Sequence, residues 1–192
     1  RQLELRAGEH VLIHAIGSGV GTAALQLAKA REATVLGTSR TASKLERARE
    51  LGLDVPIEAG DDWPEQVEAA TEGRGVPVIL DLVGGRYHLA NLRVASELGR
   101  IAVIGLVGGA RVETDLGVLL RKRLRLVGTV LRTRPLEEKI ALARDFSAEV
   151  VPLLSSGVVR PVVDSVHPFE SIADAHRLME NNTSFGKIVL LW

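Results

Sequence analysis

Residues 10–29 read HVLIHAIGSGVGTAALQLAK, and this stretch decides the fold. Its first part, 10–16, is apolar and rich in β-branched residues, which favours a buried strand. From 19 to 31, apolar side chains such as Ala23 and Leu27 recur on one face at helical spacing. Glycines separate the strand-like run from the stretch with helical spacing. The sequence therefore predicts a strand, a tight turn and a helix in direct succession.

The same alternation of short apolar runs and longer helical stretches continues to residue 131. Strands that are apolar throughout are buried on both faces of a sheet, and helices between them make the strands parallel. We therefore expect an α/β fold with a doubly wound, parallel, six-stranded Rossmann sheet that binds its ligand at the carboxyl ends of the strands. The further strands are expected at 33–38, 54–57, 76–83, 99–106 and 125–131, with helices at 43–51, 63–71 and 87–97.

The pattern changes after residue 131. A long helix is expected over 136–155, and then a strand at 161–166, a helix at 170–180 and a strand at 187–191. This C-terminal strand-helix-strand extension exceeds what six strand–helix units need. We expect two parts, a Rossmann domain over 1–156 and a separate segment over 157–192. Because a core strand begins so soon after Arg1, we also expect the chain to be a fragment of a longer polypeptide.

Composition argues against several classes of function. The 192 residues carry 24 basic and 24 acidic side chains, so no net field attracts nucleic acid or an acidic membrane. The basic cluster around 121–125 lacks interleaved aromatic residues, which indicates a solvated face or the edge of a subunit contact. No apolar run approaches the ~20 residues that span a bilayer, and no secretory signal is visible. A cytoplasmic location is the default expectation.

No self-contained catalytic or metal centre is evident. Cysteine is absent and the histidines are scattered without metal-ligand spacing, so no metal site is expected. We interpret His14 as a satisfied polar group of the core and Asp81 as a carboxylate that anchors a neighbouring loop. No Ser-His-Asp order or nucleophile elbow is present, and catalytic residues stay unassigned. Hydride transfer, by contrast, mainly requires positioning of a nicotinamide against its substrate.

The glycine turn is a candidate phosphate-binding loop. Ser18, Gly19, Val20 and Gly21 lie where the helix begins, and glycines let a pyrophosphate approach the backbone and the free N–H groups of the helix. The spacing is G-x-G-x-G, which departs from the common G-x-G-x-x-G. An ordinary glycine-rich turn is the alternative, but the repeated strand–helix units favour a dinucleotide site.

The end of the second predicted strand indicates which nicotinamide cofactor binds. An NAD site usually has an acidic residue there, about 20 residues beyond the glycines, to bind the ribose hydroxyls. This chain has Ser39 at that position, with Arg40 beside it and Lys44 in the next turn. The missing carboxylate removes repulsion against a 2′-phosphate, and the two cations can pair with it. The pattern favours NADPH, with a merely solvated basic pair as the alternative.

Other stretches carry a family resemblance. They are GEHVLIH (8–14), SGVGTAA (18–24), DLVGG (81–85), LLRKR (119–123), AHRLME (175–180) and FGKIVL (185–190). Nearly end to end, the chain resembles the zinc-free quinone oxidoreductase branch of the medium-chain dehydrogenase/reductase family, the zinc-type alcohol dehydrogenase-like proteins. The resemblance implies NADPH as cofactor, and an N-terminal GroES-like catalytic domain that this chain lacks and to which 157–192 would belong.

The resemblance also implies specific cofactor contacts. They are the loop residues Ser18, Gly19, Val20 and Gly21, then Ser39, Arg40 and Lys44, then Gly105 and Leu106 after the fifth strand, and Leu131, Phe185 and Lys187 near the nicotinamide. Arg40 stands where many members have glycine, and Ala59 stands where a tyrosine usually contacts the adenine side. Members of the family usually dimerise through their sixth strands, so a homodimer is expected through the apolar run 127–131.

Three functions follow as hypotheses. The first is a cofactor-binding portion of an NADPH-dependent quinone oxidoreductase, which passes hydride to a small-molecule electron acceptor, either a quinone or an α,β-unsaturated carbonyl. The second is an enoyl reductase module of a polyketide or fatty-acid synthase, which shares the fold and the loop. The third is a module that binds NADPH without turnover. In each case the fragment alone is expected to be inactive.

Overall fold

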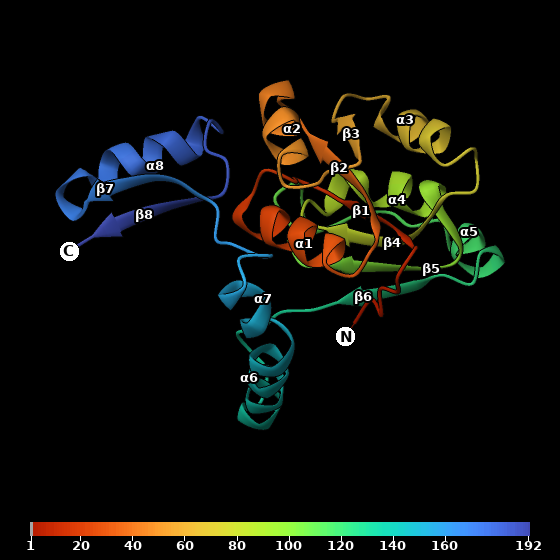
Figure 1. Ribbon diagram of the computed structural model, residues 1–192. Helices are drawn as coiled ribbons and strands as arrows, with labels where there is room; N and C mark the ends of the chain where they lie inside the picture. The colour runs from red at the N-terminus through yellow and green to blue at the C-terminus, as the bar shows by residue number, and fades with distance from the viewer. Residues whose placement is uncertain (1) are drawn as a thin grey trace.

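A parallel six-stranded sheet forms the centre of the computed structural model, which describes residues 2–192. Its strand order is β3-β2-β1-β4-β5-β6, and every neighbouring pair is parallel (Figure 1). The predicted α/β Rossmann architecture is confirmed. The strands are β1 (His10–Ile13), β2 (Thr34–Ser39), β3 (Val55–Glu58), β4 (Val76–Asp81), β5 (Ala95–Val103) and β6 (Arg125–Gly128).

The helices cover both faces of the sheet. They are α1 (Gly19–Lys29), α2 (Ala42–Arg49), α3 (Trp63–Ala70), α4 (His88–Val94) and α5 (Leu116–Arg121), with a short η1 (Gly85–Tyr87) before α4. Successive residues of β1 point to opposite faces: Leu12 packs with Trp63 and Leu92, whereas Val11 packs with Leu25 and Leu45. Strand β1 therefore needs apolar side chains at consecutive positions, because it contributes to a separate core on each face of the sheet.

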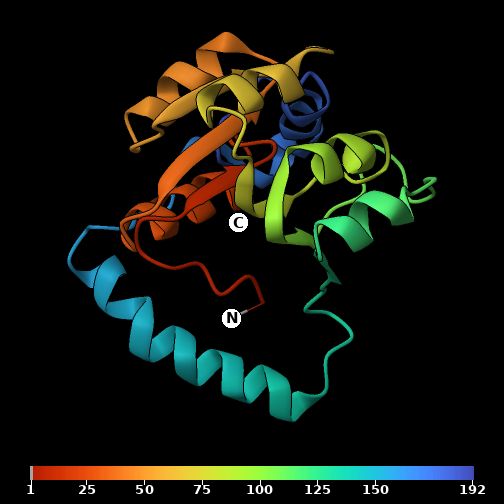
Figure 2. The ribbon, with the colours of Figure 1, turned by 90° about the vertical axis from the view of Figure 1, so that its right-hand side faces the viewer.

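The C-terminal part forms the predicted strand-helix-strand extension. A two-stranded parallel sheet pairs β7 with β8, and α6 projects away from the central sheet with none of its residues buried (Figures 1 and 2). The elements are α6 (Leu136–Glu149), α7 (Val151–Ser155), β7 (Val163–Pro168), η2 (Phe169–Ser171), α8 (Ile172–Glu180) and β8 (Lys187–Leu191).

Several predicted boundaries are wrong for identifiable backbone reasons. The single helix expected over 136–155 divides at Val150, because Pro152 in the first turn of α7 has no N–H to continue the ladder. The helix expected to reach 97 ends at Val94, since Ala95 already pairs with Val76 of β4. Helix α5 was not predicted at all, because a six-residue element followed by a run of basic residues shows no clear period.

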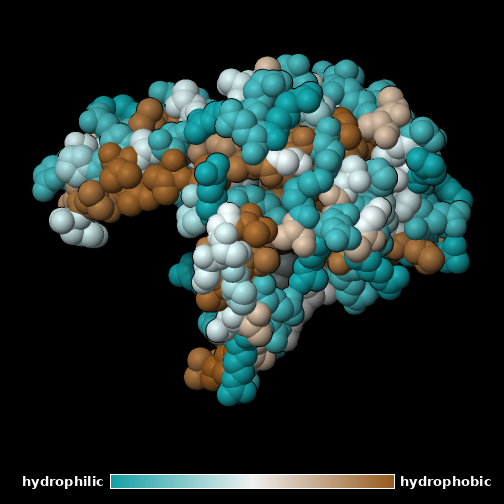
Figure 3. All heavy atoms as spheres, viewed as in Figure 1, coloured by the Kyte–Doolittle hydropathy of each residue, from teal (hydrophilic) through white to brown (hydrophobic). Residues whose placement is uncertain are grey.

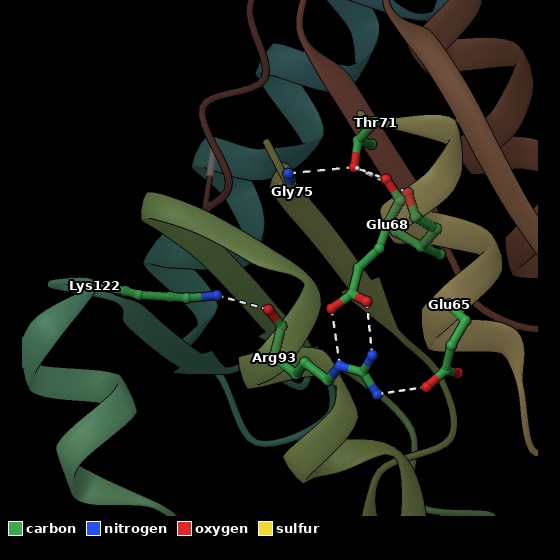
Figure 4. Close-up of polar contacts among 7 residues, drawn as sticks. Glu65, Glu68, Thr71, Gly75, Arg93 and Lys122 are labelled. Atoms are coloured by element: carbon green, nitrogen blue, oxygen red, sulfur yellow. Dashed lines mark hydrogen bonds and ion pairs between the residues drawn. The ribbon is translucent and has the colours of Figure 1, made fainter. Parts of the chain in front are cut away.

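Polar side chains join α3, α4 and α5 on one side of the sheet (Figure 4). Arg93 of α4 binds Glu68 through two N–H···O contacts of 2.8 and 2.6 Å, and Glu65 through a third of 2.6 Å. The Lys122 Nζ donates to the carbonyls of Arg93 and Ala95 at 2.6 and 2.7 Å. Partial burial lowers the pKa of Lys122. This lysine therefore satisfies the carbonyls at the end of α4, where the chain turns into β5.

We predict that Lys122→Met lowers the free energy of unfolding by about 2 kcal/mol, because it removes charge-assisted hydrogen bonds to carbonyls at the end of α4. The measurement is chemical denaturation of both proteins at pH 7. The exposed neighbour Arg121, changed to Met, is the matched control and should cost less than ~0.5 kcal/mol. Equal losses in the two variants would contradict the capping role.

Candidate cofactor-binding site

A cavity of about 650 Å³ opens at the carboxyl edge of the central sheet. It lies where ligands bind in doubly wound folds, and its volume suits a small molecule or cofactor. The carboxyl ends of β1 to β5 and the segments that follow them form one side, and the end of α8 with the start of β8 forms the other. The lining residues are Ala15, Gly17, Ser18, Gly19, Thr38, Ser39, Arg40, Lys44, Ala59, Val83, Arg86, Tyr87, Val107, Met179, Asn182, Ser184, Gly186, Lys187 and Ile188.

The glycine loop brings the first turn of α1 directly beneath β1. The Ser18 hydroxyl caps the helix by accepting a hydrogen bond from the Gly21 N–H at 2.9 Å. A Cβ at Gly21 would lie 2.5 Å from the Ala15 carbonyl oxygen, so only glycine allows this approach. Ala15 itself has a φ of 50°, in the region that side chains disfavour. The loop is thus shaped by close backbone contact, and the helix N-terminus faces the cavity.

Two lysines from distant parts of the chain lie against the loop. Lys44 of α2 comes within 2.9 Å of where a Cβ on Gly17 would stand, and Lys187 of β8 within 2.4 Å of one on Gly19. The Lys44 Nζ donates to the Asn182 Oδ1 at 3.1 Å. Burial, and then the nearby charge of Arg40, lower the pKa of Lys44. Glycines at 17 and 19 therefore leave room for the aliphatic stems of two lysines beside the helix N-terminus.

The charged side chains of the cavity wall are all positive. Its ionisable cations are Arg40, Lys44, Arg86 and Lys187, and no Asp or Glu belongs to the lining. Ser39 is buried, and its hydroxyl accepts a hydrogen bond from the Thr41 N–H at 3.2 Å. Because the whole chain is electrically neutral, this concentration is local. Such a wall favours a polyanionic ligand.

The structure brings half of the sequence-predicted residues to the cavity. Ser18, Gly19, Ser39, Arg40, Lys44 and Lys187 line it. Gly21 lies in the helix, and Val20 points outward with 47% of its surface exposed. Phe185 is buried beneath the loop under the Arg47 guanidinium, 4.5 Å from its ring centroid.

The remaining predicted residues lie outside the lining. Gly105 packs against the Leu82 carbonyl, where a Cβ would approach to 2.4 Å. Leu106 and Leu131 are exposed and do not contribute to the cavity wall. Among the residues that sequence reasoning missed, Arg86 and Tyr87 follow the fourth strand, a position from which they were predictable. Asn182, in a left-handed turn after α8, carried no signal.

Contacts of long sequence range hold the C-terminal wall in place. The Gly186 N–H donates to the Gly17 carbonyl at 2.8 Å, which ties the tail to the glycine loop. The Gln26 side chain binds both backbone groups of Arg160, at 3.0 and 2.9 Å, as a neighbouring strand would. Asp164 accepts from the Arg47 guanidinium at 3.0 Å. The tail is therefore fastened to α1, α2 and the loop.

A buried polar network lies beneath the cavity. The His14 ring bonds the Thr38 hydroxyl at 3.0 Å and the Asn91 Oδ1 at 2.7 Å. Asn91 donates to Asp81, whose other oxygen accepts the N–H groups of Val83 and Gly84 at 2.7 and 2.9 Å. Burial lowers the pKa of His14. His14 and Asp81 thus have the structural roles inferred from the sequence: one satisfies the core and the other anchors the loop after β4.

Within residues 2–192, no group of three His, Cys, Asp or Glu side chains is placed to hold a metal ion. Over the same residues, none of the helices combines the length and the apolar character needed to cross a membrane.

Comparison with known proteins identifies relatives along the whole chain. Residues 19–153 match the family model described as zinc-binding dehydrogenase. The chain is 34% identical over 196 aligned positions to the phthioceranic/hydroxyphthioceranic acid synthase of Mycobacterium tuberculosis. Its structure is similar to that of Escherichia coli quinone oxidoreductase complexed with NADPH, with a TM-score of 0.85 and 29% identity. It is equally similar to an NAD-dependent alcohol dehydrogenase, with a TM-score of 0.85 and 32% identity.

These matches cover nearly all of this chain but only part of each relative. The match takes in 97% of this chain and 9% of the synthase. For the quinone oxidoreductase the shares are 98% and 59%, and for the alcohol dehydrogenase 99% and 53%. The chain therefore spans somewhat more than half of the two solved proteins and about a tenth of the synthase.

The lowered pKa of His14 predicts a pH-dependent stability. As the pH falls below 6.5, the ordinary value, the unfolded chain binds a proton on His14 while the folded chain does not. The contribution of neutral His14 is therefore present above pH 6.5 and is lost as the pH falls toward the folded value. We expect His14→Gln to lose less stability than the parent between pH 7 and 5, by up to about 1.4 kcal/mol per pH unit.

Denaturant unfolding at pH 7, 6 and 5 measures this difference. The exposed His176, changed to Gln, is the control and should retain the pH dependence of the parent. A parent and a His14→Gln variant with parallel pH profiles would refute the prediction.

Proposed function

Because the chain belongs to the zinc-binding dehydrogenase family, we propose that it is the NADPH-binding portion of an oxidoreductase of the zinc-free, quinone oxidoreductase-like branch. Family membership agrees with the resemblance to medium-chain dehydrogenases and reductases inferred from the sequence. Although the family description names zinc, the described residues offer no ligand set for it. No step of the proposal runs through a metal.

The cation-lined, carboxylate-free cavity is the observation that carries the proposal. NADPH has a pyrophosphate and a 2′-phosphate, and both are anions. The two solved relatives differ in cofactor, since one is named NAD-dependent and the other binds NADPH. The likeness alone therefore does not choose between them. The choice of NADPH rests on Ser39 in place of an acidic residue and on the neighbouring Arg40 and Lys44.

Residues of this chain would hold the cofactor in a defined order. The loop 18–21, the N-terminus of α1 and Lys187 would face the pyrophosphate, and Arg40 with Lys44 the 2′-phosphate. When bound, NADPH supplies the hydride. The chain itself contributes orientation, a positive local field and partial exclusion of water from the cavity. Its catalytic residues stay unassigned.

We further propose that 157–192 completes a second, GroES-like domain of the parent protein. Apolar side chains gather along the lower face of β7 and β8 in Figure 3, and Val163, Val166 and Leu191 are each about half exposed. A two-stranded sheet with an open apolar face is not a stable unit on its own. That domain would hold the cleft for the electron acceptor, a quinone or an α,β-unsaturated carbonyl.

A second candidate has its own supporting observation. The chain aligns over 97% of its length with a segment that makes up 9% of a large synthase. An enoyl reductase module of a polyketide or fatty-acid synthase would use the same cavity and the same hydride chemistry. Reduction of an enoyl thioester but not of a quinone by the parent protein would decide for this candidate. A module that binds NADPH without turnover is the third possibility.

Assembly and location are proposals as well. The outer edge of β6 is unpaired in the sheet order, and Leu126, Val130 and Leu131 are exposed near it. A homodimer that pairs two such edges would cover them. We propose a cytoplasmic protein that contacts neither nucleic acid nor membrane.

Calorimetric titration of the chain with NADPH and NADH tests the cofactor assignment. We expect tighter binding of NADPH. Arg40→Ala should weaken NADPH roughly tenfold to a hundredfold and NADH less than about twofold, because only NADPH has the 2′-phosphate. Arg49→Ala is the matched control. Arg49 is the last residue of α2, which follows Arg40, and it is exposed and does not line the cavity. Absence of binding by both cofactors would sink the proposal.

The proposed second domain predicts that the chain alone does not turn over. With saturating NADPH and a simple benzoquinone, the loss of absorbance at 340 nm should not exceed the rate without protein, because the acceptor cleft would lie outside these residues. Restoring the N-terminal part of the parent protein is expected to restore the reaction. Rapid NADPH oxidation by residues 1–192 alone would show that they already hold an acceptor site.

A further inference from the structure

One part of the cavity wall has little surface on which a flat base can rest. Ala59 after β3, Arg86 and Tyr87 after β4, and Arg40 after β2 meet there. Ala59 offers a single methyl group. The broadest surfaces for an adenine ring are an aromatic side chain and a planar guanidinium.

The aromatic ring of Tyr87 is already in use by the core. It packs edge-on to the His14 ring, with centroids 4.8 Å apart, and tilted against Trp63 at 5.1 Å. Only 7% of the Tyr87 surface is exposed. These contacts leave no open ring face wide enough for a purine.

Arg86 offers a planar guanidinium on this part of the wall. Its guanidinium lies 5.5 Å from the Tyr87 ring centroid, and its aliphatic stem rests against Gly108, where a Cβ would lie 3.4 Å from the Arg86 Cγ. The side chain is exposed toward the cavity, and no carboxylate in residues 2–192 pairs with it. The aliphatic stem of Arg86 is therefore held against the protein, while its guanidinium is open to the cavity.

We propose that Arg86 stacks its guanidinium on the adenine ring of the cofactor. The inference rests on the proposed function and adds a residue to it. Arg40 and Lys44 lie together at the start of α2 and suit a phosphate, whereas Arg86 belongs to η1 after β4 and lies over the buried Tyr87 ring. Because NADPH and NADH share the adenine, Arg86 contributes affinity for both and does not discriminate between them.

Three substitutions separate a flat surface from a positive charge. Arg86→Ala removes both, Arg86→Lys keeps the charge, and Arg86→Phe keeps a planar surface. In titrations with NADPH and NADH, we expect Ala and Lys to weaken both cofactors by the same factor, about fivefold, because both lose the planar stacking surface. Phe should stay within about twofold of the parent for both.

Arg74, which is exposed and pairs with Glu72, provides the control Arg74→Ala, and its affinities should equal those of the parent. Unchanged thermal midpoints verify that the variants fold. Loss confined to NADPH, retention by Lys with loss in Phe, or no loss in Ala would each overturn the stacking role. A parent chain that binds neither cofactor refutes the proposed function itself, whereas a binding parent with unresponsive Arg86 variants refutes only this inference.

Discussion

The architecture of the site depends on the close approach of α1 to the end of β1. With no Cβ at position 21, the helix can begin directly beneath the Ala15 carbonyl, 2.5 Å from where a methyl carbon would stand. This approach aims the helix N-terminus at the carboxyl edge of the sheet and forces the chain into the tight loop of 15–19. It also leaves the pockets at Gly17 and Gly19 into which Lys44 and Lys187 extend. The arrangement of cations around the cavity therefore depends on the absence of a side chain at Gly21.

Those electrostatics come from elements that are remote in sequence. Arg40 and Lys44 follow β2, Arg86 follows β4, and Lys187 begins β8. Burial lowers the pKa of Lys44, and the neighbouring charge of Arg40 lowers it further, so the ammonium form is disfavoured there when no anion is bound. The unfavourable term is relieved when an anion enters, so the same groups that weaken the empty state favour a charged ligand.

The sequence was sufficient to predict the parallel six-stranded sheet and several residues at the ends of its strands. Ser18, Ser39 and Arg40 were predictable because the carboxyl ends of parallel strands meet at one edge. Leu131, predicted to lie near the nicotinamide, is exposed beyond the end of β6 at Gly128 and does not line the cavity. Phe185 and Asn182 depend on how the tail docks, through Asp164 and Gln26, and no local pattern encodes that. Helix α5 and the break between α6 and α7 at Val150 were also not predicted, because short elements contain too few residues to show a period.

The fastening of the tail has a consequence for the order of events in folding. The bonds that close the cavity join residues far apart in the chain: Lys44 with Asn182 across 138 positions, and Gln26 with Arg160 across 134. Loop closure of this length is slow compared with pairing of adjacent strand–helix units. During synthesis the sheet can assemble while the cavity is still missing a wall. A bound nucleotide would then report on completion of the last contacts, and its presence would shift the population toward the fully closed chain by mass action.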